Sequence, residues 1–432
     1  MADPLIAAVA KCFRQEKDVL GLVAKDLDDW RRSFDPSWPL IMAIANPTIG
    51  EQLERAEGSA ASTREDSRKN PLDLPLELQR ALREEHRSPV WLPYQELDIL
   101  EIPLSIAKAG RRRGLLDPQW LIIDSINCRP NSVRQTTKNV RQLASKLSQA
   151  DPIAFGLLTC EGAVKRLDPA GKNIVSFDLI FSVPDGMDVL QSLRRVLLNP
   201  PADISLNRRV RIAKELAKSV YYLHLINIVH QSITPESVLL FEDTVASRSS
   251  TFLVGFNNFR LEDGMEDLTG DEVWEKNVYR HPSRQGRWPE QHYVMQHDIY
   301  SLGVCLLEIG LWQSFVAYPE DSHLQAKYGK AYSQFFIWLG ESDYIPDSSS
   351  PESSGPLEFM GSRLKEYLID LARTKLPANV GEKYAQVVLS CLTCLDVDDE
   401  DFAEVEMRDE DGILIGVRFI EKVLMKLDEI LL

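Results

Sequence analysis

The stretch "IVHQSITPESVLLF", residues 228–241, decides the fold of this chain. Its apolar start predicts a buried strand or the end of a buried helix, and a polar turn separates it from a second apolar run. Pro235 lies in that turn, where its restricted φ angle fixes the path of the backbone. We therefore expect these residues to form a loop held between two buried segments.

The part of the chain before this loop is rich in predicted strands. Runs of β-branched and aromatic residues are separated by turns that contain Gly, Pro and Asn, as in antiparallel sheets. Residues 131–150 instead predict a helix. The predicted strands lie within residues 96–107, 119–126, 153–167 and 172–183, with a Gly- and Arg-rich turn, "GRRRG" (110–114), between the first two.

The chain becomes mainly helical after "PDG" (184–186). Apolar residues recur there at the spacing of helices with one buried face. The predicted helices are residues 187–198, 205–225, 297–312, 383–395 and 416–431, and a Ser-, Pro- and acid-rich segment (340–358) is expected as a surface insertion. The fold class is therefore α+β, with a small strand-rich part that contains one helix and a larger helical part.

The N-terminal residues predict a separate helical extension. Apolar residues at near-helical spacing run through residues 1–35, a flexible stretch follows (55–71), and a short helix is expected at 74–86. We therefore divide the chain into an N-terminal helical region, a linker with a short helix, the strand-rich part and the helical part. Their bounds are residues 1–54, 55–93, 94–185 and 186–432.

The composition is that of a soluble globular protein, with 44% hydrophobic and 26% charged residues among 432. A net charge of −16 argues against nucleic acid as a partner, since binding to phosphates needs surplus Lys and Arg. No apolar run approaches the length of a transmembrane helix, and the N-terminus is a poor secretory signal. Six cysteines scattered in apolar surroundings suit reduced thiols, so we expect a cytoplasmic protein.

The order of these elements, together with the quoted loop, resembles the protein kinase fold. "HQSITPES" (230–237) resembles the family's catalytic loop, and "LVGFNNF" (253–259) stands where the Asp-Phe-Gly segment would be. "VYRHPS" (278–283) takes the place of Ala-Pro-Glu, and "HDIYSLGVCLLEIG" (297–310) is similar to the helix that anchors the helical lobe. The resemblance covers roughly residues 94–432, and four motifs in the right order make it specific. It implies a two-lobed, kinase-like architecture.

The same resemblance implies that the chemistry of the family is lost. Ser232 replaces the catalytic Asp, and a serine hydroxyl lacks the charge and basicity to orient a nucleophile. Ser237 and Gly255 replace the Asn and Asp that bind Mg²⁺, and hard cations prefer carboxylate oxygens. Gln231 and Asn257 also depart from the motifs in which they stand. We therefore expect no catalytic residue and no metal site.

The strand-rich part lacks the phosphate-binding groups of the family as well. Residues 119–127, the best match to the strand that carries the phosphate-contacting lysine, contain no lysine. Residues 125–150 contain no Asp or Glu that could pair with one, and no G-x-G occurs in the chain. Glu236, Glu242 and Asp243 are candidates for displaced metal ligands, but they would have to compensate three separate losses.

The residues that resemble the family's architectural positions remain. His230 and Phe256 match two members of its internal hydrophobic column. Asp298 matches the helix-borne Asp that hydrogen-bonds the backbone of the catalytic loop, and Pro235 fixes the turn after it. The residues expected to hold the shape are thus present, and the residues expected to perform phosphoryl transfer are not.

We accordingly expect a pseudokinase that acts as a scaffold or conformational signalling module with protein partners. "YRHPSRQG" (279–286) and "LPANVGEKYAQVVLSCL" (376–392) look like fungal kinase-like proteins associated with HeLo domains, which implies incompatibility or cell-death signalling. The N-terminal region is short for a complete HeLo domain, so it is a remnant or packs on the core, and any membrane association is indirect. No cofactor is expected.

Two alternatives stay open. The first is a nucleotide-binding switch without phosphotransfer, although no motif supports ATP binding. The second is an atypical active kinase. One feature discriminates the scaffold from the switch: whether the cleft between the two parts is closed by Ile122, Ile123 and their neighbours.

Overall fold

The computed structural model describes residues 90–94, 96–112, 119–200, 204–243, 249–261, 270, 272–318, 326–341, 356–396, 398–399, 401–402 and 413–430. The predicted helical region 1–54, the stretch 55–71 and the predicted helix 74–86 lie outside these residues. The described fold is mixed α+β, as the sequence predicted.

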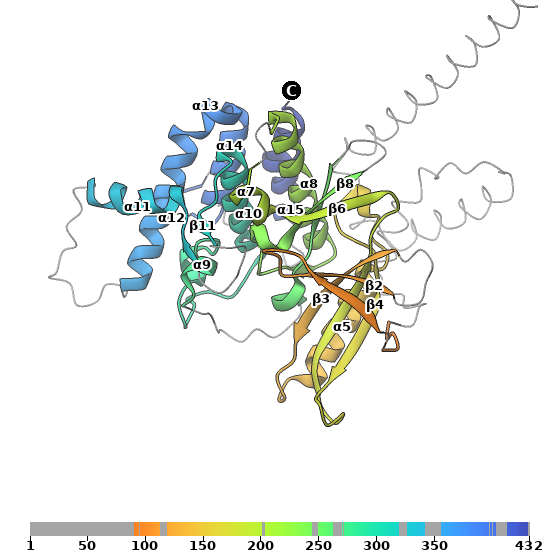
Figure 1. Cartoon of the computed structure of the whole chain (residues 1–432). Helices are drawn as coiled ribbons and strands as arrows, with labels where there is room; N and C mark the ends of the chain where they lie inside the picture. The colour runs from red at the N-terminus through yellow and green to blue at the C-terminus, as the bar shows by residue number, and fades with distance from the viewer. Residues whose placement is uncertain are drawn as a thin grey trace, which may run out of the picture.

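An antiparallel sheet of five strands stands at one end of the molecule in Figure 1. Residues of its central strand, β3, alternate between two faces, as pleated strands require. Leu121 and Ile123 join a small cluster on one face, whereas Ile122 and Ile126 enter the main core. The strand order is β1 (Leu97–Glu101), β2 (Lys108–Arg112), β3 (Trp120–Asn127), β5 (Ile174–Ser182) and β4 (Cys160–Leu167).

Helix α5 (Val133–Leu147) covers the core-side face of this sheet and confirms the helix predicted at 131–150. Its buried residues, Val140, Leu143, Ala144 and Leu147, recur at helical spacing. Near its end the buried Lys146 donates a hydrogen bond from Nζ to the carbonyl oxygen of Ile226 at 2.6 Å. The helix is thereby attached to the helical part of the molecule.

The strand predicted at 153–167 begins later than expected. Residues Pro152–Phe155 form a helical turn, α6, and β4 starts only at Cys160. Asp151 caps this turn by accepting hydrogen bonds from the backbone of Ile153 and Ala154, and Pro152 at its first position favours a helical start. The apolar residues of this stretch favour a strand, and the cap at Asp151 with Pro152 makes the first of them helical.

The helix predicted at 187–198 is wrong in its first half. Met187–Ser192 form strand β6, and only Leu193–Leu198 form a helix, α7. β6 pairs with β8 (Val238–Asp243), which also pairs with β9 (Ser249–Leu253) to give a three-stranded sheet. A partner strand that lies some 50 residues away in the sequence overrode the local helical pattern here.

The remaining helices gather at the other end of the molecule (Figure 1). The central one is α10, nearly all of whose residues are buried, and it packs against α8, α13 and α14. The helices predicted at 205–225, 297–312, 383–395 and 416–431 are confirmed, the last as a run with a π-helical turn at Ile420–Leu424. These elements are α8 (Leu206–Leu225), α9 (Trp274–Asn277), α10 (Met295–Leu311), α11 (Lys330–Glu341), α12 (Pro356–Thr374), α13 (Leu376–Val380), α14 (Glu382–Thr393), α15 (Ile413–Phe419) and α16 (Met425–Asp428).

Two short strand pairs complete the fold. β7 (Ile228–Val229) pairs with β10 (Arg260–Leu261), and β11 (Val316–Ala317) pairs with β12 (Lys327–Tyr328). The first pair brings the segments on either side of residues 230–259 together. Within the described ranges, every helix is too short or too polar to cross a bilayer.

Candidate functional site

The loop 230–237 follows β7 and is attached to α10 by Asp298. The carboxylate of Asp298 accepts hydrogen bonds from the backbone N–H of His230 at 2.7 Å and of Gln231 at 2.9 Å. The Tyr293 hydroxyl donates to the same carboxylate at 2.8 Å, and His224 Nε2 lies 3.2 Å from it. Burial opposes the charge of Asp298, but the contacts with His224 and His230 hold the pKa of this carboxyl below its usual value.

His230 is a core residue, and both of its ring nitrogens have hydrogen-bond partners. Its Nδ1 accepts a hydrogen bond from the backbone N–H of Ser232 at 3.3 Å. Its Nε2 lies 3.0 Å from the carbonyl oxygen of Val254, and its ring centroid lies 5.1 Å from that of Phe256. Phe181 of β5 continues the row, with its centroid 6.1 Å from that of Phe256. Burial lowers the pKa of His230 to about 4, so its ring is neutral at pH 7. The row joins the loop to the five-stranded sheet through apolar contacts.

The two serines of the loop are engaged in local hydrogen bonds. Ser232 Oγ accepts a hydrogen bond from Asn258 Nδ2 at 2.8 Å. Ser237 Oγ donates to the Thr234 carbonyl at 2.8 Å and accepts from the Thr234 N–H at 3.1 Å, around a turn that begins at Pro235. Gln231 adopts a left-handed conformation (φ 63°), and Asn257 is exposed on the next segment. These contacts shape the backbone and leave no carboxylate at positions 232, 237 or 255.

A carboxylate that sequence reasoning missed occupies this region. Asp124 of β3 is fully buried, and its Oδ2 accepts hydrogen bonds from the backbone N–H groups of Gly255 at 2.8 Å and Phe256 at 2.7 Å. Its sequence signal is one acid within the apolar strand "WLIIDSIN", and such a residue is rarely buried without specific partners.

Asp124 carries an unsatisfied oxygen and a perturbed pKa. Its Oδ1 is buried and makes no hydrogen bond with any described residue. Burial raises the pKa of Asp124 to about 6, the two backbone N–H groups act against that rise, and Asp178 adds to it. A buried anion therefore lies beside the segment 255–256 at neutral pH, and it would repel the phosphates of a nucleotide placed there.

The backbone at Gly255 fits this carboxylate and disfavours a side chain. Gly255 has φ +91°, and a Cβ atom there would lie 3.0 Å from Ser237 Cβ and 3.2 Å from Ile106 Cδ1. A non-glycine residue would thus be strained and crowded at this position. A carboxylate from β3 thus lies beside position 255, which itself carries no side chain.

The connection between β1 and β2 lies over the loop 230–237. The Ile106 N–H donates to the carbonyl oxygen of Glu236 at 3.1 Å, and Ser192 Oγ donates to the carbonyl oxygen of Pro103 at 2.9 Å. Ile102 and Leu104 of this connection are buried, the latter with a left-handed φ of 54°. Buried apolar side chains of this connection therefore lie beside the loop.

The prediction that "GRRRG" (110–114) is a turn is wrong for its first half. Gly110, Arg111 and Arg112 belong to β2 and pair with β1 and β3. The β1–β2 turn lies earlier, at residues 102–107, and interrupts the strand predicted at 96–107. The Gly- and Arg-rich composition of β2 does not predict a strand, because its pairing with β1 and β3 depends on contacts with other segments.

A buried ion-pair network lies beneath the loop and engages Glu236. Arg194 of α7 has no exposed surface and donates to Glu236 from Nε at 2.9 Å and from Nη2 at 3.1 Å. Its Nη1 donates to Glu308 Oε1 at 3.0 Å, and the Tyr279 hydroxyl donates to Glu308 Oε2 at 3.0 Å. Although burial opposes it, the charge of Arg194 lowers the pKa of Glu236, which is therefore ionised.

Two of the three candidates for displaced metal ligands, Glu236 and Glu242, are paired with arginines. Glu236 pairs with Arg194, and Glu242 accepts a hydrogen bond from Arg208 at 2.8 Å. Asp243 ends strand β8, where it pairs with Met187 in the backbone register. Among the residues that the structure describes, no three His, Cys, Asp or Glu side chains gather as metal ligands would.

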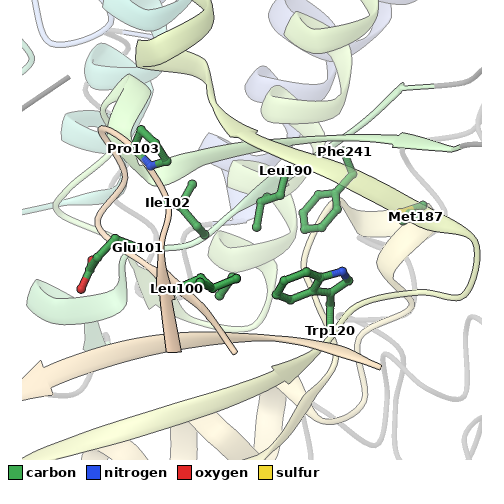
Figure 2. A pocket seen from close by; sticks show the side chains of 9 residues that line it. Leu100, Glu101, Ile102, Pro103, Trp120, Met187, Leu190 and Phe241 are labelled. Atoms are coloured by element: carbon green, nitrogen blue, oxygen red, sulfur yellow. The ribbon is translucent and has the colours of Figure 1, made fainter. Parts of the chain in front are cut away.

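A cavity of about 200 Å³ lies between the two sheets (Figure 2). Trp120 and Phe241 face it from β3 and β8, and the β1–β2 connection borders it. Ile122 and Ile123 differ in their roles: Ile122 is fully buried in the main core, whereas Ile123 packs in the small cluster on the opposite face of the sheet. The lining residues are Leu100, Glu101, Ile102, Pro103, Ala109, Trp120, Met187, Leu190 and Phe241.

The arrangement can hold a backbone loop rigidly, but it presents no base and no pair of metal-binding carboxylates at the motif positions. Comparison with known proteins adds no further assignment: no protein-family model matches the chain, and no curated protein matches it.

Proposed function

We propose that the chain carries a non-catalytic, protein kinase-like domain that acts as a scaffold or conformational signalling module. In this proposal the five-stranded sheet with α5 corresponds to the small lobe, and the region from α7 to α16 to the helical lobe. The hydrogen bonds between Asp298 and the backbone of residues 230–231 support it, as do the apolar contacts of His230 with Phe256.

One observation carries the proposal: Asp124 accepts two hydrogen bonds from the segment 255–256. Phosphoryl transfer needs cations around the phosphates, from a lysine and from metal ions. The described site instead places a buried carboxylate there, and the β1–β2 connection lies on the loop. The carboxylate and the connection would therefore disfavour binding of a nucleoside triphosphate.

As a scaffold, the domain would present its surface to partner proteins and need no turnover. The setting we propose is fungal incompatibility or cell-death signalling, which rests on the resemblance of residues 279–286 and 376–392. Any contact with a membrane would then be indirect, through the predicted N-terminal helices or through a partner.

The test combines unfolding and labelling of the full-length protein. A ligand that binds only the folded state raises its stability and therefore its Tm. Because we expect ATP not to bind, we expect no shift of Tm with ATP, either with Mg²⁺ or with EDTA. We also expect no incorporation of labelled phosphate into the protein or a generic substrate.

Each contrary outcome has a distinct meaning. A Tm shift that persists in EDTA, without transfer, would favour the nucleotide-binding switch over the scaffold. Phosphate incorporation that Glu236→Gln or Glu242→Gln abolishes would overturn the proposal in favour of an active kinase.

A further inference from the structure

The cavity between the two sheets has the shape of a small binding site. Figure 2 shows Leu100 and Trp120 on the side of the five-stranded sheet, and Leu190 and Phe241 opposite them. Met187 closes the side near β6. Residues far apart in the sequence thus converge on one space, as in most small-molecule sites.

The size of the cavity restricts its ligand to one or two rings. Engineered apolar cavities of about 150 Å³ stay dry and bind benzene. A space of about 200 Å³ therefore has room for a ring system of the size of indole, and the sugar and phosphates of a nucleotide would have to extend beyond it.

The lining selects an uncharged aromatic ligand. Two aromatic rings and a thioether face the space, and such groups favour planar partners. The one charged lining residue, Glu101, pairs with Lys108 at 2.7 Å and is largely exposed, so it lies at the rim. The nearby cation of Arg111 is stacked on Trp120, with Cζ 3.7 Å from the ring centroid.

The deep side of the cavity is closed to phosphates. Ile102 and Pro103 border it there, and the same connection places Ile106 against residues 236 and 255. The buried carboxylate of Asp124 is hydrogen-bonded to that segment. A ligand that extends inward with negative charge would therefore meet apolar side chains and a buried anion.

We propose that this cavity binds an uncharged aromatic molecule of one or two rings, without phosphate, and thereby fastens the five-stranded sheet to the three-stranded sheet. The inference rests on the proposed function in one respect, which is that the site performs no phosphoryl transfer. It adds a ligand class and a structural consequence, since the bound ring would contact β3 on one side and β8 on the other.

The experiment uses indole as the probe, with the full-length protein. We expect indole to raise Tm in a saturable manner, and isothermal titration to give one site per chain. Ala109→Leu adds three carbon atoms to the cavity wall and should weaken indole binding about tenfold or more. Ala170→Leu, in the exposed turn between β4 and β5, is the matched control and should bind indole as the wild type does.

A second variant guards against misfolding of the first. Trp120 is only half-buried, so Trp120→Leu should fold and still lose about tenfold in indole affinity. Absence of any Tm shift with indole, or equal affinity in all three variants, would overturn the inference and leave the proposed function intact. Phosphate transfer from ATP would overturn the proposed function instead, whatever indole does.

Discussion

Asp124 of β3 accepts a hydrogen bond from the backbone N–H of Phe256 at 2.7 Å, across 132 residues of sequence. The contact joins the five-stranded sheet to the segment after β9. It also places a titratable group in a fully buried position, with one oxygen left without a hydrogen bond among the described residues.

Asp124→Asn should change how stability depends on pH. Burial raises the pKa of Asp124 to about 6, so the folded state holds this proton more tightly than the unfolded chain does. The contribution of Asp124 to stability is therefore largest below about pH 4 and is lost as the pH rises to about 6, a difference of about 3 kcal/mol. In urea unfolding, the free energy of unfolding of the variant relative to that of the wild type should rise by about that amount between pH 4 and pH 7.5. A difference between the two proteins that is equal at both pH values would contradict this.

Arg194→Met should be strongly destabilising. It leaves Glu236 and Glu308 buried without their shared cation, a loss that typically costs about 3–5 kcal/mol. Arg208→Met removes a surface pair with Glu242 and is the matched control, with an expected cost below about 1 kcal/mol. An equal loss of unfolding free energy in the two variants would show that the buried network stabilises the fold no more than a surface ion pair does.

Gly255→Asp should not create a kinase. The new side chain would need the positive φ of +91° and would press on Ser237 and Ile106, at a cost of about 1–3 kcal/mol. Gly255→Ala carries the same strain without the charge, so the further loss in the Asp variant measures repulsion by Asp124. Adding Asp124→Asn to Gly255→Asp should remove that further loss, and phosphate incorporation should stay absent in every variant. Transfer by Gly255→Asp alone would refute this reading of the site.

Asp298→Asn should loosen the loop that begins at His230. The variant replaces one accepting oxygen by an NH₂ group, which must face donors from the loop backbone or from Tyr293. An unmatched buried polar group costs about 1–3 kcal/mol. Hydrogen exchange at the amides of residues 230 and 231 should accelerate, while Glu429→Gln, in an exposed pair with Lys383, should leave it unchanged. Unaltered protection of both amides in Asp298→Asn would argue that other contacts hold the loop.

Local patterns predicted what local interactions determine. The helices at 205–225 and 297–312 have clear apolar periodicity, and they form with bounds within two residues of the prediction. The resemblance to a motif assigned Asp298 a backbone contact with the loop, and hydrogen bonds to His230 and Gln231 are present. The first inference uses information carried by neighbouring residues, whereas the second needed the resemblance, because Asp298 and His230 lie 68 residues apart.

Interactions between distant segments explain what was missed. β6 was predicted as helix because its pairing with β8 is not encoded in its own periodicity. The role of Asp124 could not be predicted because its partners are two backbone N–H groups, and every residue type except proline has one. The β1–β2 connection turns through Leu104 in a left-handed conformation, a position where sequence reasoning expects Gly or Asn.

The hydrogen bond from Lys146 to the Ile226 carbonyl has a mechanical consequence. It ties the last turn of α5 to the residue that directly follows α8, two positions before β7. Moving α5 away from α8 would therefore break a buried hydrogen bond, at a typical cost of about 0.5–1.5 kcal/mol. The position of α5 is thereby coupled to the end of α8, which leads through β7 to His230.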